Sequence, residues 1–193
     1  MPFTYTNRKG FTYYLCQTTT KTGKTRYYFA REPKDTPVEV LPDGYQVEES
    51  VNAVVSVVKA SPKLVLPEEL ATVEAALKKL PKSHKYRATI KNKQIIIYES
   101  RGADFDEMAA SIGWSVPASL GQEFEERHAQ FSPIMRFILE NAEERIFSPQ
   151  RWCFRGSIDD WIYILKPAKI EVLTKELIPT LGTDDFFELY RGA

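Results

Sequence analysis

KYRATIKNKQIIIYE, residues 85–99, contains two short strand-like runs on either side of the turn Asn92-Lys93. Apolar side chains occupy every second position of both runs: Tyr86, Ala88 and Ile90 in the first, Ile95 and Ile97 in the second. A period of two is typical of a strand that buries one face, and a short polar turn between two such runs favours antiparallel pairing. The segment therefore predicts a hairpin with one buried face.

A helix is expected directly before this hairpin. Pro67 suits the first turn of a helix, and Glu68 and Glu69 complement the positive end of the helix dipole. Apolar residues then recur at helical spacing: Leu70, Val73, Leu77 and Leu80. The pattern predicts a helix that begins at Pro67 and packs one apolar stripe.

Further hairpins are predicted on both sides of this region. The runs rich in aromatic and β-branched residues are Phe11–Gln17, Thr25–Ala30, Phe131–Leu139 and Arg145–Phe154. Helices are predicted after Pro167 and at Thr183, and Ser157 followed by Asp160 is typical of a helix cap. Helices interspersed irregularly among hairpins indicate an α+β fold, an antiparallel sheet built from hairpins with two to three packed helices.

The length of 193 residues fits a single α+β domain over residues 1–193. Residues 102–122 are richer in Gly, Ala and Ser than their surroundings, which makes them a candidate linker. In that alternative the linker joins two sub-lobes, residues 1–101 and residues 123–193. The sequence leaves both arrangements open.

Charge is segregated along the chain although its formal sum is zero, with 26 Lys and Arg against 26 Asp and Glu. Counting charged residues gives +6 for residues 1–31, −6 for 32–77, +7 for 78–101 and −6 for 102–160. If the two basic segments lie on one face, they form an electrostatic footprint for a polyanion. If they pair with the acidic segments instead, each surface ion pair adds little stability.

The leading hypothesis is therefore a cytoplasmic binding module for nucleic acid or another anionic partner. The candidate contact residues are Lys21, Lys24, Arg26 and Tyr28 in the first hairpin and Lys91 and Lys93 in the second. Cations neutralise phosphates, and exposed aromatic rings stack on unpaired bases. Because neighbouring strand residues point to opposite faces, at least half of the hairpin aromatics are expected to belong to the core.

Two further hypotheses belong to other classes. Arg155, Asp159 and Asp160 lie between two tryptophans, and such residues serve a metal-dependent hydrolase or phosphoryl-processing enzyme when a third ligand is nearby. The competing interpretation is structural, with Asp160 as part of the helix cap. A protein–protein adaptor, docking through Phe186–Tyr190, is the third hypothesis.

Several chemistries are not expected from the sequence. Residues 21–25, KTGKT, match the end of a P-loop, but Thr18 stands where the first glycine belongs and a strand-like run follows. No metal site or cofactor is expected, since Cys16, Cys153, His84 and His128 lack short ligand spacing, and Cys153 lies in an apolar run. Without a signal-like segment or a run of about 18 apolar residues, a cytoplasmic protein with no membrane partner is expected.

Overall fold

A computed structural model of the chain describes residues 1–33, 35–102, 113, 129–155 and 158–190, with only the backbone at Arg155 and Ile158. The chain divides into two compact units, Met1–Ser61 and Pro62–Ala193, called here the N-terminal and C-terminal units. This division falls at a different place from the expected linker at 102–122, most of which lies outside the described residues. The strands that flank that segment pair with each other and belong to one unit.

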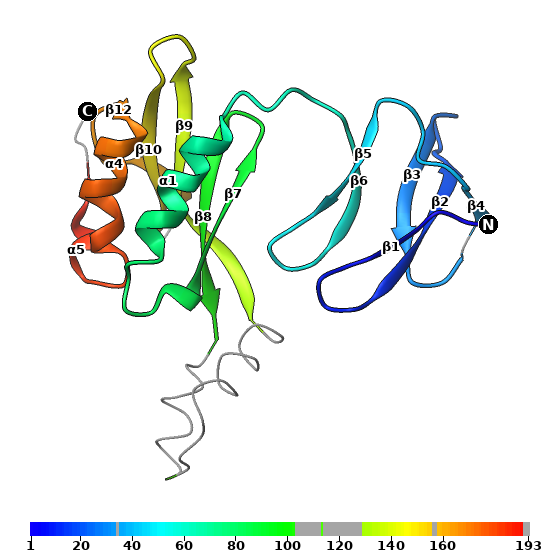
Figure 1. Cartoon of the computed structure of the whole chain (residues 1–193), viewed down its shortest axis with the longest axis horizontal. Coiled ribbons are helices and arrows are strands. Elements are labelled where there is room, and N and C mark those ends of the chain that lie inside the picture. The colour runs from blue at the N-terminus through cyan, green and yellow to red at the C-terminus, as the bar shows by residue number, and fades with distance from the viewer. Residues whose placement is uncertain (34, 103–112, 114–128, 156–157, 191–193) are drawn as a thin grey trace. The chain divides into compact units, whose positions relative to one another are not determined.

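The N-terminal unit consists of antiparallel strands (Figure 1). They are β1 (Thr4–Thr6), β2 (Thr12–Thr19), β3 (Thr25–Ala30), β4 (Thr36–Pro37), β5 (Tyr45–Glu49) and β6 (Val55–Lys59). One sheet has the order β1-β2-β3, with β4 also paired to β2, and β5 and β6 form a second, two-stranded sheet. The predicted hairpin of Phe11–Gln17 with Thr25–Ala30 is confirmed as β2 and β3.

One face of the β1-β2-β3 sheet packs internally through aromatic rings. Phe29 contacts Phe3 and Tyr5, each at 6.3 Å between ring centroids. The Tyr5 hydroxyl donates a hydrogen bond of 3.0 Å to Glu49 Oε2 on β5, and this bond raises the pKa of Tyr5. Leu15, which pairs with Phe29, is fully buried, and the Tyr5–Glu49 hydrogen bond links this sheet to β5.

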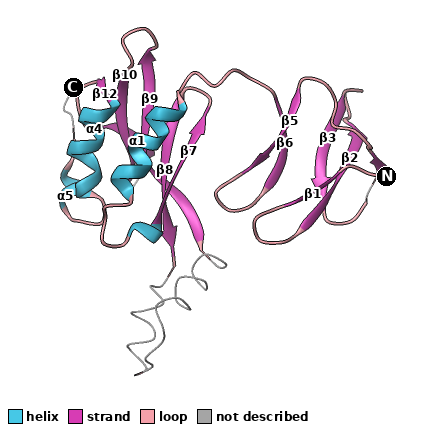
Figure 2. Ribbon diagram, viewed as in Figure 1, coloured by secondary structure: helices cyan, strands magenta, loops and turns pink. Residues whose placement is uncertain are grey.

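The C-terminal unit is a six-stranded antiparallel sheet with helices, drawn in cyan in Figure 2. Its strands are β7 (Tyr86–Lys91), β8 (Gln94–Arg101), β9 (Gln130–Asn141), β10 (Ile146–Arg155), β11 (Ile158–Tyr163) and β12 (Ala168–Lys169). Its helices are α1 (Pro67–Leu77), α4 (Ile170–Leu177) and α5 (Asp185–Glu188), with short 3₁₀ turns η1 (Ser83–Lys85) and η2 (Ile178–Thr180). The strand order is β11-β10-β9-β8-β7, and β12 pairs with β10.

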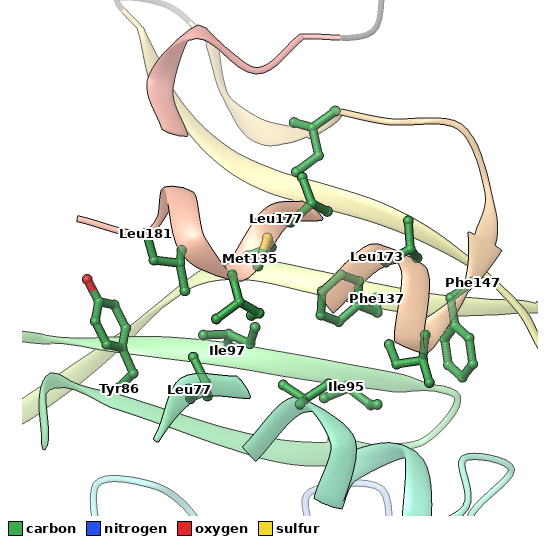
Figure 3. Packing of buried hydrophobic residues seen from close by; sticks show 14 of the residues in the cluster. Leu77, Tyr86, Ile95, Ile97, Met135, Phe137, Phe147, Leu173, Leu177 and Leu181 are labelled. Atoms are coloured by element: carbon green, nitrogen blue, oxygen red, sulfur yellow. The ribbon is translucent and has the colours of Figure 1, made fainter. Parts of the chain in front are cut away.

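The helices cover one face of this sheet. Leu173 and Leu177 of α4 and Leu77 of α1 lie against the buried strand residues, as Figure 3 shows. Those strand residues alternate along the chain, which is the period expected from the sequence: Ile95, Ile97, Met135, Phe137 and Phe147. Burial of such a face is the main stabilising term of the unit.

An ion pair between Arg145 and the buried carboxylate of Glu69 fixes the start of α1 against the β9–β10 turn. Glu69 is only 7% exposed, and it accepts a 2.7 Å hydrogen bond from Arg145 Nε. Its other oxygen, Oε2, accepts the Leu66 backbone N–H at 2.8 Å, which caps the helix. Glu69, which the sequence analysis assigned to the helix dipole, therefore also joins two segments that are far apart in the sequence.

The expected fold class is confirmed in its coarse form, with antiparallel sheets and three α-helices among the described residues. More of the described residues lie in strands than in helices. One expectation is wrong: Ser157-Asp160 does not start a helix, because residues 158–163 form β11. Trp161 pairs with Trp152 in a continuous antiparallel ladder between the consecutive strands β10 and β11, and this strand pairing overrides the cap signal.

Candidate nucleic-acid interface

The tip of the β2–β3 hairpin presents three cations. Lys21, Lys24 and Arg26 are exposed, and none of them forms an ion pair with a described residue. The turn is held by Thr20, whose backbone oxygen accepts the Gly23 N–H at 2.9 Å and whose Oγ1 accepts the Lys24 N–H at 3.1 Å. Gly23 has a φ of +78°, as expected of a hairpin turn rather than of a phosphate loop before a helix.

The aromatic rings of this hairpin are engaged within the unit. Tyr27 packs edge-on against Tyr45, with 5.2 Å between ring centroids, and Phe29 packs against Phe3 and Tyr5. Tyr28 is on the opposite face, beside Arg26, and its hydroxyl donates a 2.6 Å hydrogen bond to Asp35 Oδ2. That bond raises the pKa of Tyr28 to about 12. The hairpin therefore supplies exposed cations, while its role as a stacking platform through Tyr28 stays a prediction.

The β7–β8 turn presents a second set of cations in the C-terminal unit. Lys91 and Lys93 are exposed, and neither pairs with an acid among the described residues. Asn92 between them has a φ of +55°, a conformation that Asn tolerates better than most residues. The Lys93 backbone oxygen accepts the Leu139 N–H at 2.9 Å, which fixes the turn against β9. The two sets of cations belong to different units, and each is considered within its own unit.

The face of the C-terminal sheet opposite α1 and α4, called here the outer face, carries an aromatic patch. The patch is made of Trp152, Phe154, Trp161 and Tyr163, which share this face by strand alternation and register. Phe154 is 81% exposed and Tyr163 is 47% exposed, while the two tryptophans are half-buried and meet edge to face at 5.2 Å. Lys91 shares the outer face through its pairing with Gln94.

Arg136 lies next to this patch on the outer face. Its Nε donates a 2.7 Å hydrogen bond to Gln150 Oε1, and its guanidinium carbon is 4.3 Å from the Trp161 ring centroid. Burial lowers the pKa of Arg136 from its ordinary value. No described residue accepts a hydrogen bond from its two terminal nitrogens or forms an ion pair with it. The Arg136 side chain is therefore a fixed, partly desolvated cation whose terminal N–H groups can still donate hydrogen bonds.

Sequence reasoning missed this outer-face arrangement. The signal was present in the period-two spacing of Trp152 with Phe154 and of Trp161 with Tyr163. The expected helix at 157–160 broke that pattern, so the four rings were not recognised as neighbours. Arg136 carried no signal of its own, because its position depends on the register between β9 and β10.

The candidate catalytic residues lie where β10 and β11 meet. Asp159 and Asp160 are consecutive on β11 and exposed, so their side chains extend to opposite faces of the ribbon. Asp160 Oδ1 accepts the Trp161 backbone N–H at 2.7 Å. Arg155 is the last residue of β10, and its side chain is outside the described part. This geometry gives a shared metal site no support, and the enzyme hypothesis stays a prediction.

The remaining candidate ligands and nucleophiles are dispersed. No group of three or more His, Cys, Asp and Glu side chains within the described ranges is placed to hold a metal ion. Cys16 and Cys153 are both buried and unbridged, and they belong to different units. His128 lies outside the described residues.

Two further findings concern membrane-spanning helices and similarity to known proteins. No helix in the described part of the chain is long and apolar enough to cross a membrane. Compared with known proteins, the chain matches no family model, no curated protein and no solved structure.

Proposed function

We propose that this protein binds nucleic acid through cationic hairpin turns. The observation that carries the proposal is the state of five cations at two hairpin turns: Lys21, Lys24, Arg26, Lys91 and Lys93. Each is exposed and lacks an acidic partner among the described residues, so each is available to a phosphate. A phosphate contact releases condensed counterions, which makes such binding favourable at low salt.

The placement of these cations supports an extended ligand rather than a small one. Turn residues reach beyond the ends of the paired strands, and neither turn contributes to the two pockets beside α1. A mobile, solvated lysine provides a point charge with little geometric selectivity, which suits a repeating backbone of phosphates. The proposed ligand is accordingly a nucleic-acid strand, bound mainly through its backbone.

The test uses the full chain and a fluorescently labelled oligothymidylate at low salt. The triple variant Lys21→Gln, Lys24→Gln, Arg26→Gln and the double variant Lys91→Gln, Lys93→Gln should each weaken binding measured by fluorescence anisotropy. The matched control is Lys78→Gln, Lys79→Gln, which removes two exposed cations after α1 on the helix side of the sheet. Equal affinities for the wild type and both turn variants would remove the proposal.

A further inference from the structure

We infer that the outer face of the C-terminal sheet is a stacking site for single-stranded nucleic acid, with Arg136 taking a phosphate and the aromatic patch taking bases. This inference rests on the proposed function and adds to it the face, the ligand form and the residues. It uses Arg136, Phe154 and Tyr163, none of which belongs to the cationic turns.

Arg136 provides the anion-binding half of the site. Gln150 and the Trp161 ring hold its guanidinium in one orientation, so little conformational entropy is lost when a ligand binds. The terminal nitrogens lack an acceptor among the described residues, and a planar donor fork of this kind matches two oxygens of a phosphate. Burial disfavours the charged form of Arg136, the Asp160 carboxylate offsets this only in part, and a bound phosphate would stabilise the cation further.

The aromatic patch provides the half of the site that recognises bases. Phe154 leaves 81% of its surface in water, although a large apolar side chain is usually buried. Tyr163 is 47% exposed and lies on β11 opposite Gln150, the residue that orients Arg136. Two strand spacings of about 4.8 Å separate β9 from β11, so one or two nucleotides are enough to reach from the guanidinium to the rings.

The terminal donors of Arg136 favour nucleic acid over an apolar protein partner. An apolar surface laid over the patch would also cover Arg136 and leave its terminal donors unpaired, which is strongly unfavourable. A single strand of nucleic acid satisfies both halves, because each nucleotide carries a phosphate and a flat base. Double-stranded DNA is not expected there, since its bases are already stacked and paired.

The test compares oligothymidylate and oligouridylate with inorganic polyphosphate, which has the charge but no bases. Phe154→Ala should weaken binding to both oligonucleotides about 5- to 150-fold, the range that loss of one base–ring stack produces. Its affinity for polyphosphate should not change. Tyr190→Ala is the matched control, because Tyr190 is 67% exposed and lies in the C-terminal unit near α5. Arg136→Gln should weaken binding to oligonucleotides, and circular dichroism verifies that each variant is folded.

The possible results distinguish a failure of the stacking site from a failure of the proposed function. If Phe154→Ala and Arg136→Gln bind oligonucleotides like the wild type while the turn variants do not, the stacking site is wrong and the proposed function stands. If Phe154→Ala weakens polyphosphate and oligonucleotide binding equally, the ring does not stack on bases and the inference is also overturned. If neither ligand binds the wild type at low salt, the proposed function fails and the stacking site with it.

Discussion

Gly182 shows how one residue determines the packing of another. Its φ is +77°, and a Cβ built on it would lie 3.0 Å from the Tyr86 hydroxyl oxygen. That hydroxyl donates a 2.9 Å hydrogen bond to Glu99 Oε1, and burial with this bond raises the pKa of Tyr86. Any side chain at position 182 therefore acts on both the backbone and a buried hydrogen bond.

Gly182→Ala should lower the free energy of unfolding of the C-terminal unit by about 2 kcal/mol, through the left-handed conformation and displacement of the tyrosine. Urea denaturation followed by circular dichroism measures the loss. Gly23→Ala is the matched control, since Gly23 has a φ of +78° and no atom within 4 Å of its Cβ position. If the contact matters, Tyr86→Phe costs less stability in the Gly182→Ala protein than in the wild type. Equal losses for both glycine variants would contradict this account of Gly182.

The Tyr28–Asp35 hydrogen bond makes the stability of the N-terminal unit depend on alkaline pH. The folded pKa of Tyr28 is raised from 10.0 to about 12, so the protonated hydroxyl is the stabilising form. Its contribution is complete below pH 10.0 and is lost as the pH rises toward about 12. The melting temperature of the wild type should therefore exceed that of Tyr28→Phe up to pH 10, and the difference should shrink above it.

In an Asp35→Ala background, the effect of Tyr28→Phe should lose this pH dependence, because the acceptor is gone. A difference between wild type and Tyr28→Phe that stays constant through pH 12 would show that the hydroxyl contributes through packing instead.

The Glu69–Arg145 pair joins residues 76 positions apart in the sequence. Arg145→Asn keeps a residue that tolerates the observed φ of +55° but removes the guanidinium. It should cost about 3 kcal/mol of stability, because it leaves a buried carboxylate unpaired. The double variant with Glu69→Gln should recover part of that loss in urea denaturation. Lys169 is an exposed cation that lines a surface pocket together with Glu69 and Arg145, and a loss no greater than that of Lys169→Asn would contradict this role.

At the scale of elements, the hairpins were predictable and the β10–β11 connection was not. Alternation of apolar residues such as Ile95 and Ile97 is a local signal, and it gave the correct strands and buried face. Ser157 and Asp160 also gave a local signal, for a helix cap, but antiparallel pairing of β11 with the preceding strand β10 determined the structure. The outer-face patch could not be predicted once β11 was taken for a helix.

The register of that ribbon makes a prediction about charge. Asp159 pairs with Phe154 and lies on the same face, where a carboxylate repels phosphate. Asp159→Asn should tighten oligothymidylate binding about 2- to 5-fold at low salt, since a unit charge at about 4 Å in water is worth about 1 kcal/mol. Glu74→Gln, an exposed acid on α1, should leave the affinity unchanged. Weaker binding by Asp159→Asn, or loss of a Mn²⁺ response seen in the wild type, would favour the metal hypothesis instead.

At the scale of the whole molecule, the sequence predicted segregated charge but not the division into units. The boundary between Ser61 and Pro62 carries no Gly-rich or Ser-rich stretch, whereas residues 102–122 do, so composition pointed to a different connection. The basic segments 1–31 and 78–101 fall in different units, and each contributes an exposed turn with unpaired cations. The sequence therefore predicted the two basic segments, but it did not predict that they belong to different units.

The most direct test of nucleic-acid binding is the salt dependence of oligothymidylate affinity for the wild-type chain. The logarithm of the association constant should fall linearly with the logarithm of salt concentration, with a slope of about −0.7 for each phosphate contacted. Removal of the cations at either turn should make the slope shallower. An affinity that does not change with salt, or no binding at low salt, would contradict phosphate recognition by these turns.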